Sequence, residues 1–165
     1  MRKKLPEKLK IDSILEAVLE IRFEPDPSMV PEILFGRLAD ADRWQAFRQA
    51  RLPTADIPAP IRRADKNLKY QASIELGSPD GGILVRIGPQ VLSYIRRGKY
   101  PGWKEFGAEI EYTVSQLYKV IPNAHVSRIG LRYINALRSD VHEINGLDDT
   151  DIVISVAHDK ISNNL

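Results

Sequence analysis

The sequence contains no cysteine, which excludes a disulfide scaffold, a thiolate zinc site, a CxxC redox centre and a cysteine nucleophile. It has no apolar stretch near the roughly 20 residues that cross a bilayer, and its first residues lack the apolar run of a signal peptide. With 24 Lys and Arg against 22 Asp and Glu, the net charge of +2 gives no field that implies nucleic acid or a membrane. We therefore expect a cytoplasmic protein with no membrane partner.

Motifs of recognised chemistry are missing as well. The chain has no GxSxG elbow, no supported SxxK, no GxGxxG and no GxxxxGK[ST] loop. Its three histidines are scattered, and the acidic stretch around His142 matches no metal-binding spacing. We predict no metal, no cofactor and no catalytic residue. An enzyme is disfavoured, although a carboxylate pair such as Glu16 and Glu20 can be assembled in space without a local signature.

The length of 165 residues suits one hydrophobic core, so we predict a single domain over residues 1–165. Residues 1–10 form a basic segment that we interpret as a flexible leader rather than a binding arm. We interpret residues 138–165 as an extension that is either short or incomplete.

What is present is clear periodicity. Apolar and polar residues alternate over residues 13–23, which favours a strand over the helix that Leu, Ala and Glu would otherwise allow. An apolar stripe after Pro31 and another after Trp103 have helical spacing. The predicted strands are residues 13–23, 67–76, 83–87, 91–97, 125–137 and 152–156, and the predicted helices are residues 30–41 and 103–121.

This order, β-α-β-β-β-α-β-β, predicts an α+β fold. Short, turn-rich connections such as the one at residues 78–82 join antiparallel neighbours. Two helices with one apolar stripe each must bury it against the sheet, so we predict a two-layer sandwich with a mainly antiparallel sheet and both helices on one face. The Pro-rich residues 52–61 are interpreted as an extended connection.

The opposite sheet face is expected to be polar and open, and it is the candidate contact surface. Arg128 and Arg132 lie on the same side of one strand with Gly130 between them. One interpretation is a solvated ladder of Glu and Arg pairs, the second is a surface that binds a carboxylate or phosphate, and the third is a dimer interface. The candidate binding residues are Arg128, Gly130, Arg132, Lys69, Arg86 and Glu20.

A second, weaker signal is an aromatic and basic corner around Tyr94, Tyr100, Trp103 and Phe106. Such a mixture is typical of surfaces that stack single-stranded nucleic acid, but Trp103 and Phe106 are better explained as core residues of the long helix. Binding of RNA would require Tyr94 and Tyr100 to be exposed.

Three features together resemble a known family: the LEAVLEIRF strand, the YPGW corner before a long helix, and RIGLRYINAL at residues 128–137. They are similar to those of an uncharacterised, sporadically distributed prokaryotic family with a late R-x-G-L-R-Y-I-N strand. The resemblance spans about residues 5–137. It implies no activity, cofactor or catalytic residue, and it implies that relatives continue into a further strand-rich portion, which would cover a sheet edge or face that is bare here.

From these observations we predict a non-enzymatic cytoplasmic interaction module that uses the open sheet face. Its expected partner is a second copy, a different protein or a small anionic ligand. The alternatives are a nucleic-acid-associated accessory or toxin-neutralising protein that uses Lys69, Arg96, Arg97 and Arg132, and an enzyme with a site in the sheet cavity.

Overall fold

The computed structural model describes residues 12–25, 29–143, 146 and 149, and the backbone of residues 155–156 and 159–160. The chain divides into two compact units, Ile14–Ile134 and a smaller unit made of Met1–Ser13 with Asn135–Leu165. Each unit is described by itself below.

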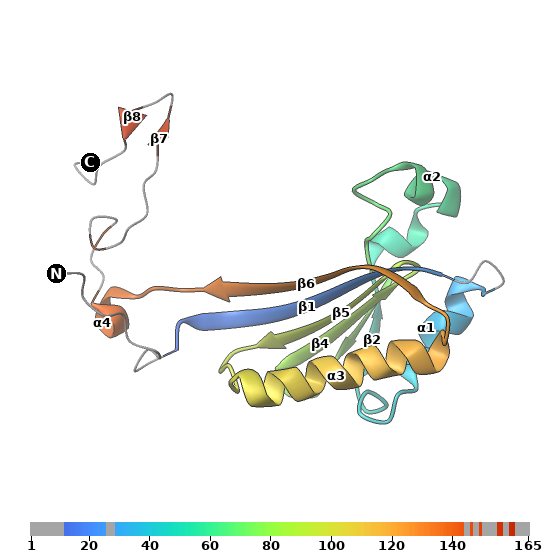
Figure 1. The fold of residues 1–165 in the computed structure, drawn as a ribbon, viewed down its shortest axis with the longest axis horizontal. Coiled ribbons are helices and arrows are strands. Elements are labelled where there is room, and N and C mark those ends of the chain that lie inside the picture. Colours follow the sequence, from blue (N-terminus) through green and yellow to red (C-terminus); the bar gives the residue numbers. More distant parts are fainter. Residues whose placement is uncertain are drawn as a thin grey trace. The chain divides into compact units, whose positions relative to one another are not determined.

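The larger unit is built on one antiparallel sheet of six strands in the order β2-β3-β4-β5-β1-β6 (Figure 1). Strand β6 lies at one edge, and its last residue, Asn135, belongs to the smaller unit. The strands are β1 (Ile14–Glu24), β2 (Arg48–Arg51), β3 (Ile74–Gly77), β4 (Ile83–Gly88), β5 (Val91–Arg97) and β6 (His125–Asn135).

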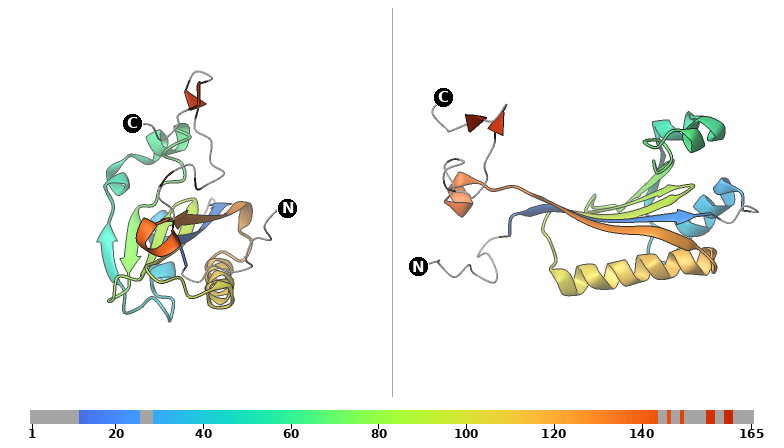
Figure 2. Two further views of the ribbon diagram at one scale, coloured as in Figure 1. Left: turned by 90° about the vertical axis from the view of Figure 1, so that its left-hand side faces the viewer. Right: turned by 45° about the horizontal axis from the view of Figure 1, so that its top comes forward.

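Two helices, α1 (Pro31–Ala39) and α3 (Trp103–Val120), pack on one face of this sheet. Pro31 stands at the start of α1, where its missing N–H costs nothing. Gly102 precedes α3 with a φ of 92°, which a residue with a side chain rarely adopts. Figure 2 shows α3 lying along the sheet. The predicted two-layer α+β sandwich is therefore confirmed.

The core lies between the helices and the strand residues that alternation assigns to the helical face. Leu19, Ile21 and Phe23 of β1 are fully buried in it. Phe106 of α3 packs its ring against Tyr94 of β5, with centroids 6.2 Å apart. Trp44, which follows α1, closes the core against Tyr112 of α3 with an edge-to-face contact at 5.7 Å.

The segment between α1 and β3 differs from the sequence prediction. The Pro-rich residues form a 3-10 helix, η1 (Pro53–Asp56), and the start of helix α2 (Ala59–Ala64), rather than an extended connection. The predicted strand over residues 67–76 is wrong for its first seven residues, and β3 begins only at Ile74. The reason is local, because the Asp65 carboxylate accepts hydrogen bonds from the N–H groups of Asn67 and Leu68 and holds a turn there.

The smaller unit contains a short helix, α4 (Ser139–His142), and a two-stranded sheet of β7 (Ser155–Val156) and β8 (Asp159–Lys160). Within it, the Ser13 hydroxyl donates to Asn135 Oδ1 at 3.1 Å and the Ala136 N–H donates to the Ser13 carbonyl at 2.8 Å. The basic residues 1–10 and residues 152–154 of the last predicted strand lie outside the described residues.

Candidate functional site

The sheet face opposite α1 and α3 carries the charged residues that the alternation predicts. The strand register aligns Glu20 of β1 with Ser93, Ser93 with Arg86 of β4, and Arg86 with Glu75 of β3. Directly opposite residues of an antiparallel pair point to the same face. Glu20 and Arg86 therefore share one polar face.

Most charges on this polar face are paired with each other. Arg86 Nε lies 2.7 Å from Glu75 Oε2, Arg22 Nε lies 2.7 Å from Glu20 Oε1, and Arg97 Nε lies 3.2 Å from Glu16 Oε2. Exposed pairs of this kind contribute about 0–1 kcal/mol each. The arrangement is a solvated ladder of Glu and Arg pairs, one of the three interpretations of this face drawn from the sequence. Each pair neutralises its carboxylate locally.

Arg128 and Arg132 join the same ladder more loosely. Arg128 Nη1 is 3.9 Å from Glu20 Oε1, and Arg132 Nη2 is 4.0 Å from Glu16 Oε1. Both side chains are more than half exposed, so a partner can reach their guanidinium groups. The space above Gly130 is filled by the Arg128 side chain, whose guanidinium lies 3.7–4.0 Å from where a Cβ on Gly130 would stand.

Lys69 is not part of this face, and its placement there is corrected. It lies in the turn after α2 instead of on a strand, because the strand begins only at Ile74. Its ammonium is 5.2 Å from the centre of the Tyr70 ring, which Arg22 also covers at 4.5 Å. Lys69 also lines a cavity beside α2.

The middle of the polar face holds a small apolar cluster that alternation alone does not reveal. Val18, Leu84 and Ile95 are buried there and pack together across three neighbouring strands. The sequence signals for the cluster are Val18 between Glu16 and Glu20, Leu84 two residues before Arg86, and Ile95 two residues before Arg97. The polar face is therefore a charged rim around an apolar centre.

The least expected surface is the other side of β6. Tyr133 points toward the helical layer, with its ring 5.8 Å from Tyr100 and 6.2 Å from Phe106. By alternation Ile129 and Leu131 point to the same side. These three side chains, the β6 apolar row, keep 58%, 45% and 36% of their surface exposed for Ile129, Leu131 and Tyr133.

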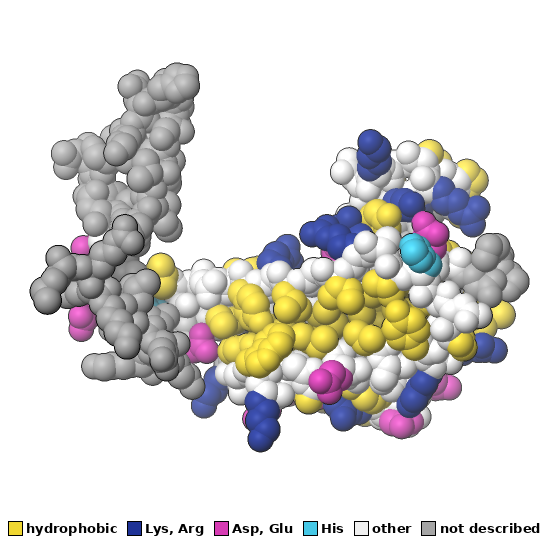
Figure 3. All heavy atoms as spheres, in the orientation of Figure 1, with side chains coloured by type: hydrophobic (Ala, Val, Ile, Leu, Met, Phe, Trp, Pro, Cys, Tyr) yellow, Lys and Arg dark blue, Asp and Glu magenta, His cyan; other side chains and the backbone are white. Residues whose placement is uncertain are grey.

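The β6 apolar row belongs to a broader hydrophobic surface. Figure 3 shows hydrophobic side chains gathered in a continuous band along β6 and the neighbouring α3. An exposed apolar band of this kind marks an interaction site on most soluble proteins. The sequence placed these residues on the covered face, but within the described residues that face is only partly covered at the edge strand, where Ile129 and Leu131 stay about half exposed.

The two edges of the sheet differ in how they discourage further pairing. Strand β2 has only four residues, carries Arg48 and Arg51, and is soon followed by Pro53. Strand β6 has eleven residues and no proline, although it carries Arg128 and Arg132. Short length and proline are usual protections of an edge strand, so of the two edges β6 is the one more open to a new strand.

The remaining chemistry of the described residues is sparse. Tyr94 is 1% exposed, and burial raises the pKa of its hydroxyl, so this ring is not available to stack on a base. Among the described residues no group of three or more His, Asp or Glu is placed to hold a metal, and none of their helices is long and apolar enough to cross a membrane. The carboxyl groups with resolved pKa shifts, Asp80 and Asp140, are exposed and their pKa values are lowered.

Comparison of the chain with protein-family models, curated proteins and solved structures gives no match. The resemblance to the R-x-G-L-R-Y-I-N family therefore stays a prediction, and the function has to be inferred from the surfaces themselves.

Proposed function

We propose that this protein is a non-enzymatic interaction module that binds its partner by adding a strand to β6. The observation that carries the proposal is the β6 apolar row, exposed along an unprotected edge of eleven residues. Strand addition would supply main-chain hydrogen bonds along β6, and the row would supply side-chain contacts.

The partner that fits best is a second copy of the chain. If two β6 strands pair antiparallel about a two-fold axis at Leu131, Leu131 faces its own counterpart and Ile129 faces the partner's Tyr133. On the polar face, Arg132 then faces the partner's Gly130, and Arg128 faces the partner's Ile134. No guanidinium lies directly opposite another, whereas an axis at Gly130 would set Arg128 against the partner's Arg132.

This register also gives the exposed arginines a role. It gathers Arg128 and Arg132 of both copies on the polar face of one continuous sheet. Four guanidinium groups on neighbouring strands would attract a carboxylate or phosphate, which fits the small anionic ligand expected from the sequence. The same residues would then serve both the dimer and an anionic ligand at its centre.

The energetics support a dimer of moderate strength. Full burial of a large apolar side chain contributes about 1.5–3 kcal/mol, so the six half-exposed side chains of two rows contribute about 6 kcal/mol. Each new main-chain hydrogen bond adds about 0.5–1.5 kcal/mol, while association costs about 4–15 kcal/mol. We expect a dissociation constant on the order of 1–100 μM.

The first test is light scattering after size-exclusion chromatography over a concentration series. We expect mass to rise from monomer to dimer, and Leu131→Lys to abolish the rise because two ammonium groups would face each other at the axis. The matched control is Ile33→Lys on α1, an equally exposed apolar residue away from β6, which should leave the dimer intact. A wild-type monomer at several hundred micromolar would contradict the proposal.

The second test reads the register. Because the chain has no cysteine, a single introduced thiol is unique in each copy. Residues opposite each other in an antiparallel pair have Cα atoms about 4.5–5.5 Å apart, within the range that a disulfide spans. Under mild oxidation Leu131→Cys should cross-link, whereas Ile129→Cys and Arg128→Cys should not. Cross-linking at position 130 instead would show a different register of the same dimer.

A further inference from the structure

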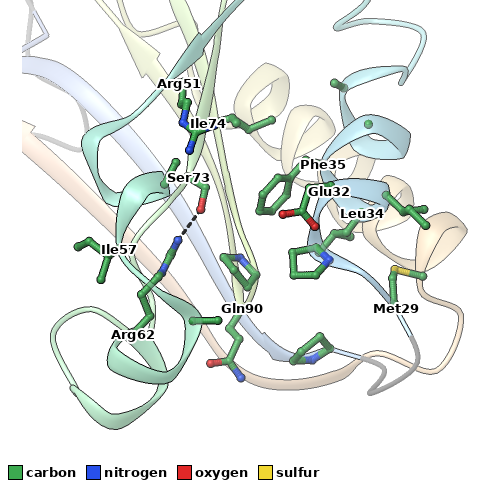
Figure 4. A pocket seen from close by; sticks show the side chains of 18 of the residues that line it. Met29, Glu32, Leu34, Phe35, Arg51, Ile57, Arg62, Ser73, Ile74 and Gln90 are labelled. Carbon is green, nitrogen blue, oxygen red and sulfur yellow. Dashed lines mark hydrogen bonds between the residues drawn. The ribbon is translucent and has the colours of Figure 1, made fainter.

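A large cavity lies at one end of the sheet, between α1 and the η1–α2 segment. It has a volume of about 1530 Å³ and its floor includes Ser73, Ile74 and Gln90 (Figure 4). None of its lining residues belongs to β6 or α3. It is therefore separate from the surface proposed for dimerisation.

The α2 wall of this cavity contains a buried arginine that has only neutral partners. Arg62 is 7% exposed, and its guanidinium donates to Ser73 Oγ at 2.6 Å, to the Thr54 carbonyl at 3.2 Å and to the Gln71 carbonyl. Among the described residues, no carboxylate lies within 4.0 Å of it. Burial removes the guanidinium from water and so lowers the pKa of Arg62. With no carboxylate beside it, the wall keeps an uncompensated positive charge.

The charges around Arg62 reinforce that field. Arg63 and Lys69 line the same side of the cavity. Arg51 also lines it, but its guanidinium lies 2.5 Å from Asp56 Oδ1 and is neutralised there. On the opposite wall, α1 and its C-terminal end contribute Glu32, Arg37 and Asp40. The α2 wall is thus basic and the α1 wall carries charges of both signs, which favours an anionic head at the α2 wall.

The lining between the two walls is mixed. Phe35 of α1 points into the cavity, and Met29, Ile74 and Pro89 add apolar surface beside polar side chains such as Gln90 (Figure 4). Sites for small organic ligands combine such apolar walls with a few charged or polar groups, and they usually measure about 300–1,000 Å³. This cavity has the same composition and exceeds that size, so it can take an elongated ligand.

We propose that the cavity between α1 and α2 binds an amphiphilic organic anion, with its carboxylate or phosphate head at Arg62, Arg63 and Lys69 and its apolar body against Phe35 and Ile74. Arg62 is held rigidly by its three hydrogen bonds, so little ordering is needed when the head arrives. Arg63 and Lys69 are the accessible members of the set and supply the longer-range attraction.

The test is calorimetric titration with three probes of equal chain length: decanoate, decyl phosphate and decyltrimethylammonium. We expect both anions to bind and the cation to bind at least tenfold more weakly, and the ratio of the two anions identifies the preferred head. All titrations use Leu131→Glu protein, whose introduced carboxylates keep two copies apart and add no cation to the β6 apolar row. Equal binding of the cation, or no binding of either anion at millimolar concentration, would overturn the proposal.

Two sets of variants locate the site. The double substitution Arg63→Glu with Lys69→Glu should weaken decanoate binding at least tenfold, while Lys104→Glu with Lys119→Glu on α3 reverses the same number of charges elsewhere and should leave it unchanged. Phe35→Ser should weaken both anions without changing their ratio. If the α3 double variant loses as much affinity as the cavity double variant, the attraction is general and the site is wrong. Failure here leaves the dimer at β6 untouched, because the two surfaces share no residue.

Discussion

Replacing Arg62 tests how the η1–α2 segment is held to the sheet. Its guanidinium bridges η1, through the Thr54 carbonyl, to the chain that enters β3, through Gln71 and Ser73. The variant Arg62→Met keeps the length of the side chain and removes all three hydrogen bonds. The structure predicts that this segment loosens while the core beneath α3 stays intact.

The size of the effect follows from opposing contributions. Hydrogen bonds to a charged group contribute about 1.5–3 kcal/mol each, so three give roughly 4–9 kcal/mol before any offset. Removing the cation also removes its burial penalty of several kcal/mol, and the freed carbonyls beside the open cavity can bind water. We expect a net loss of about 2 kcal/mol for Arg62→Met and about 3 kcal/mol for Arg62→Ala, which also loses packing.

The assay is thermal unfolding followed by the fluorescence of Trp44, which is 2% exposed, in a Trp103→Phe background that removes the exposed indole. The midpoint of thermal unfolding should fall by about 2–4 °C per kcal/mol in a chain of this size. The control is Arg63→Met, the neighbouring exposed arginine, which should change stability by less than about 0.5 kcal/mol. If both variants unfold like the wild type, Arg62 does not hold the segment and the reasoning fails.

Three further predictions concern single positions. Gly88→Ala should lower the free energy of unfolding by about 1–3 kcal/mol, because a Cβ there would stand 2.5 Å from the Gln71 carbonyl oxygen. Gly36→Ala in α1 should raise it by about 0.5–1 kcal/mol, because a Cβ there meets nothing within 4 Å. Chemical unfolding of both variants checks the contrast. Phe106→Leu should remove one of the two ring contacts of Tyr133, leaving the one with Tyr100, and weaken the dimer in sedimentation measurements, while a dimer of wild-type strength would show that the Phe106 ring is not needed. Ser78→Ala should move the pKa of Asp80 back toward its usual value of about 3.9 in an NMR titration, because the Ser78 hydroxyl is the main cause of its lowering. Since that lowered pKa favours the folded state only above the unfolded value, the stabilisation from Asp80 should fade as pH drops below about 4, and to a smaller extent in the variant.

Much of the fold could be predicted from the sequence because the elements beneath the core have unbroken periodicity. The alternation of β1 and the helical stripes of α1 and α3 match the side that the structure buries, whereas β4 and β5, which were predicted from their turns, are buried on both faces. Residues 67–73 show the limit of the method. Their alternation is as regular as that of β1, but the Asp65 turn and the Arg62 contacts override it.

The candidate site was only partly predictable. The alternation of side chains along each strand predicted one shared face for Glu20, Arg86, Arg128 and Arg132, and the ion pairs confirm that they share it. The same alternation predicted that Ile129 and Leu131 lie on the covered face. They are exposed, because strand order decides whether a helix lies above them. Strand order depends on long-range pairing, which no local pattern encodes.

The inequality of the two sheet edges limits how far assembly can proceed. If a symmetric contact occupies β6, the remaining edge of the six-stranded sheet is the four-residue β2, whose short length and nearby proline resist pairing. Growth into filaments through this sheet requires two receptive edges on every subunit, whereas the sheet has one. Pairing through β6 therefore ends the assembly at a dimer, and a change that lengthens β2 or replaces Pro53 would be the one most prone to produce fibrous aggregates.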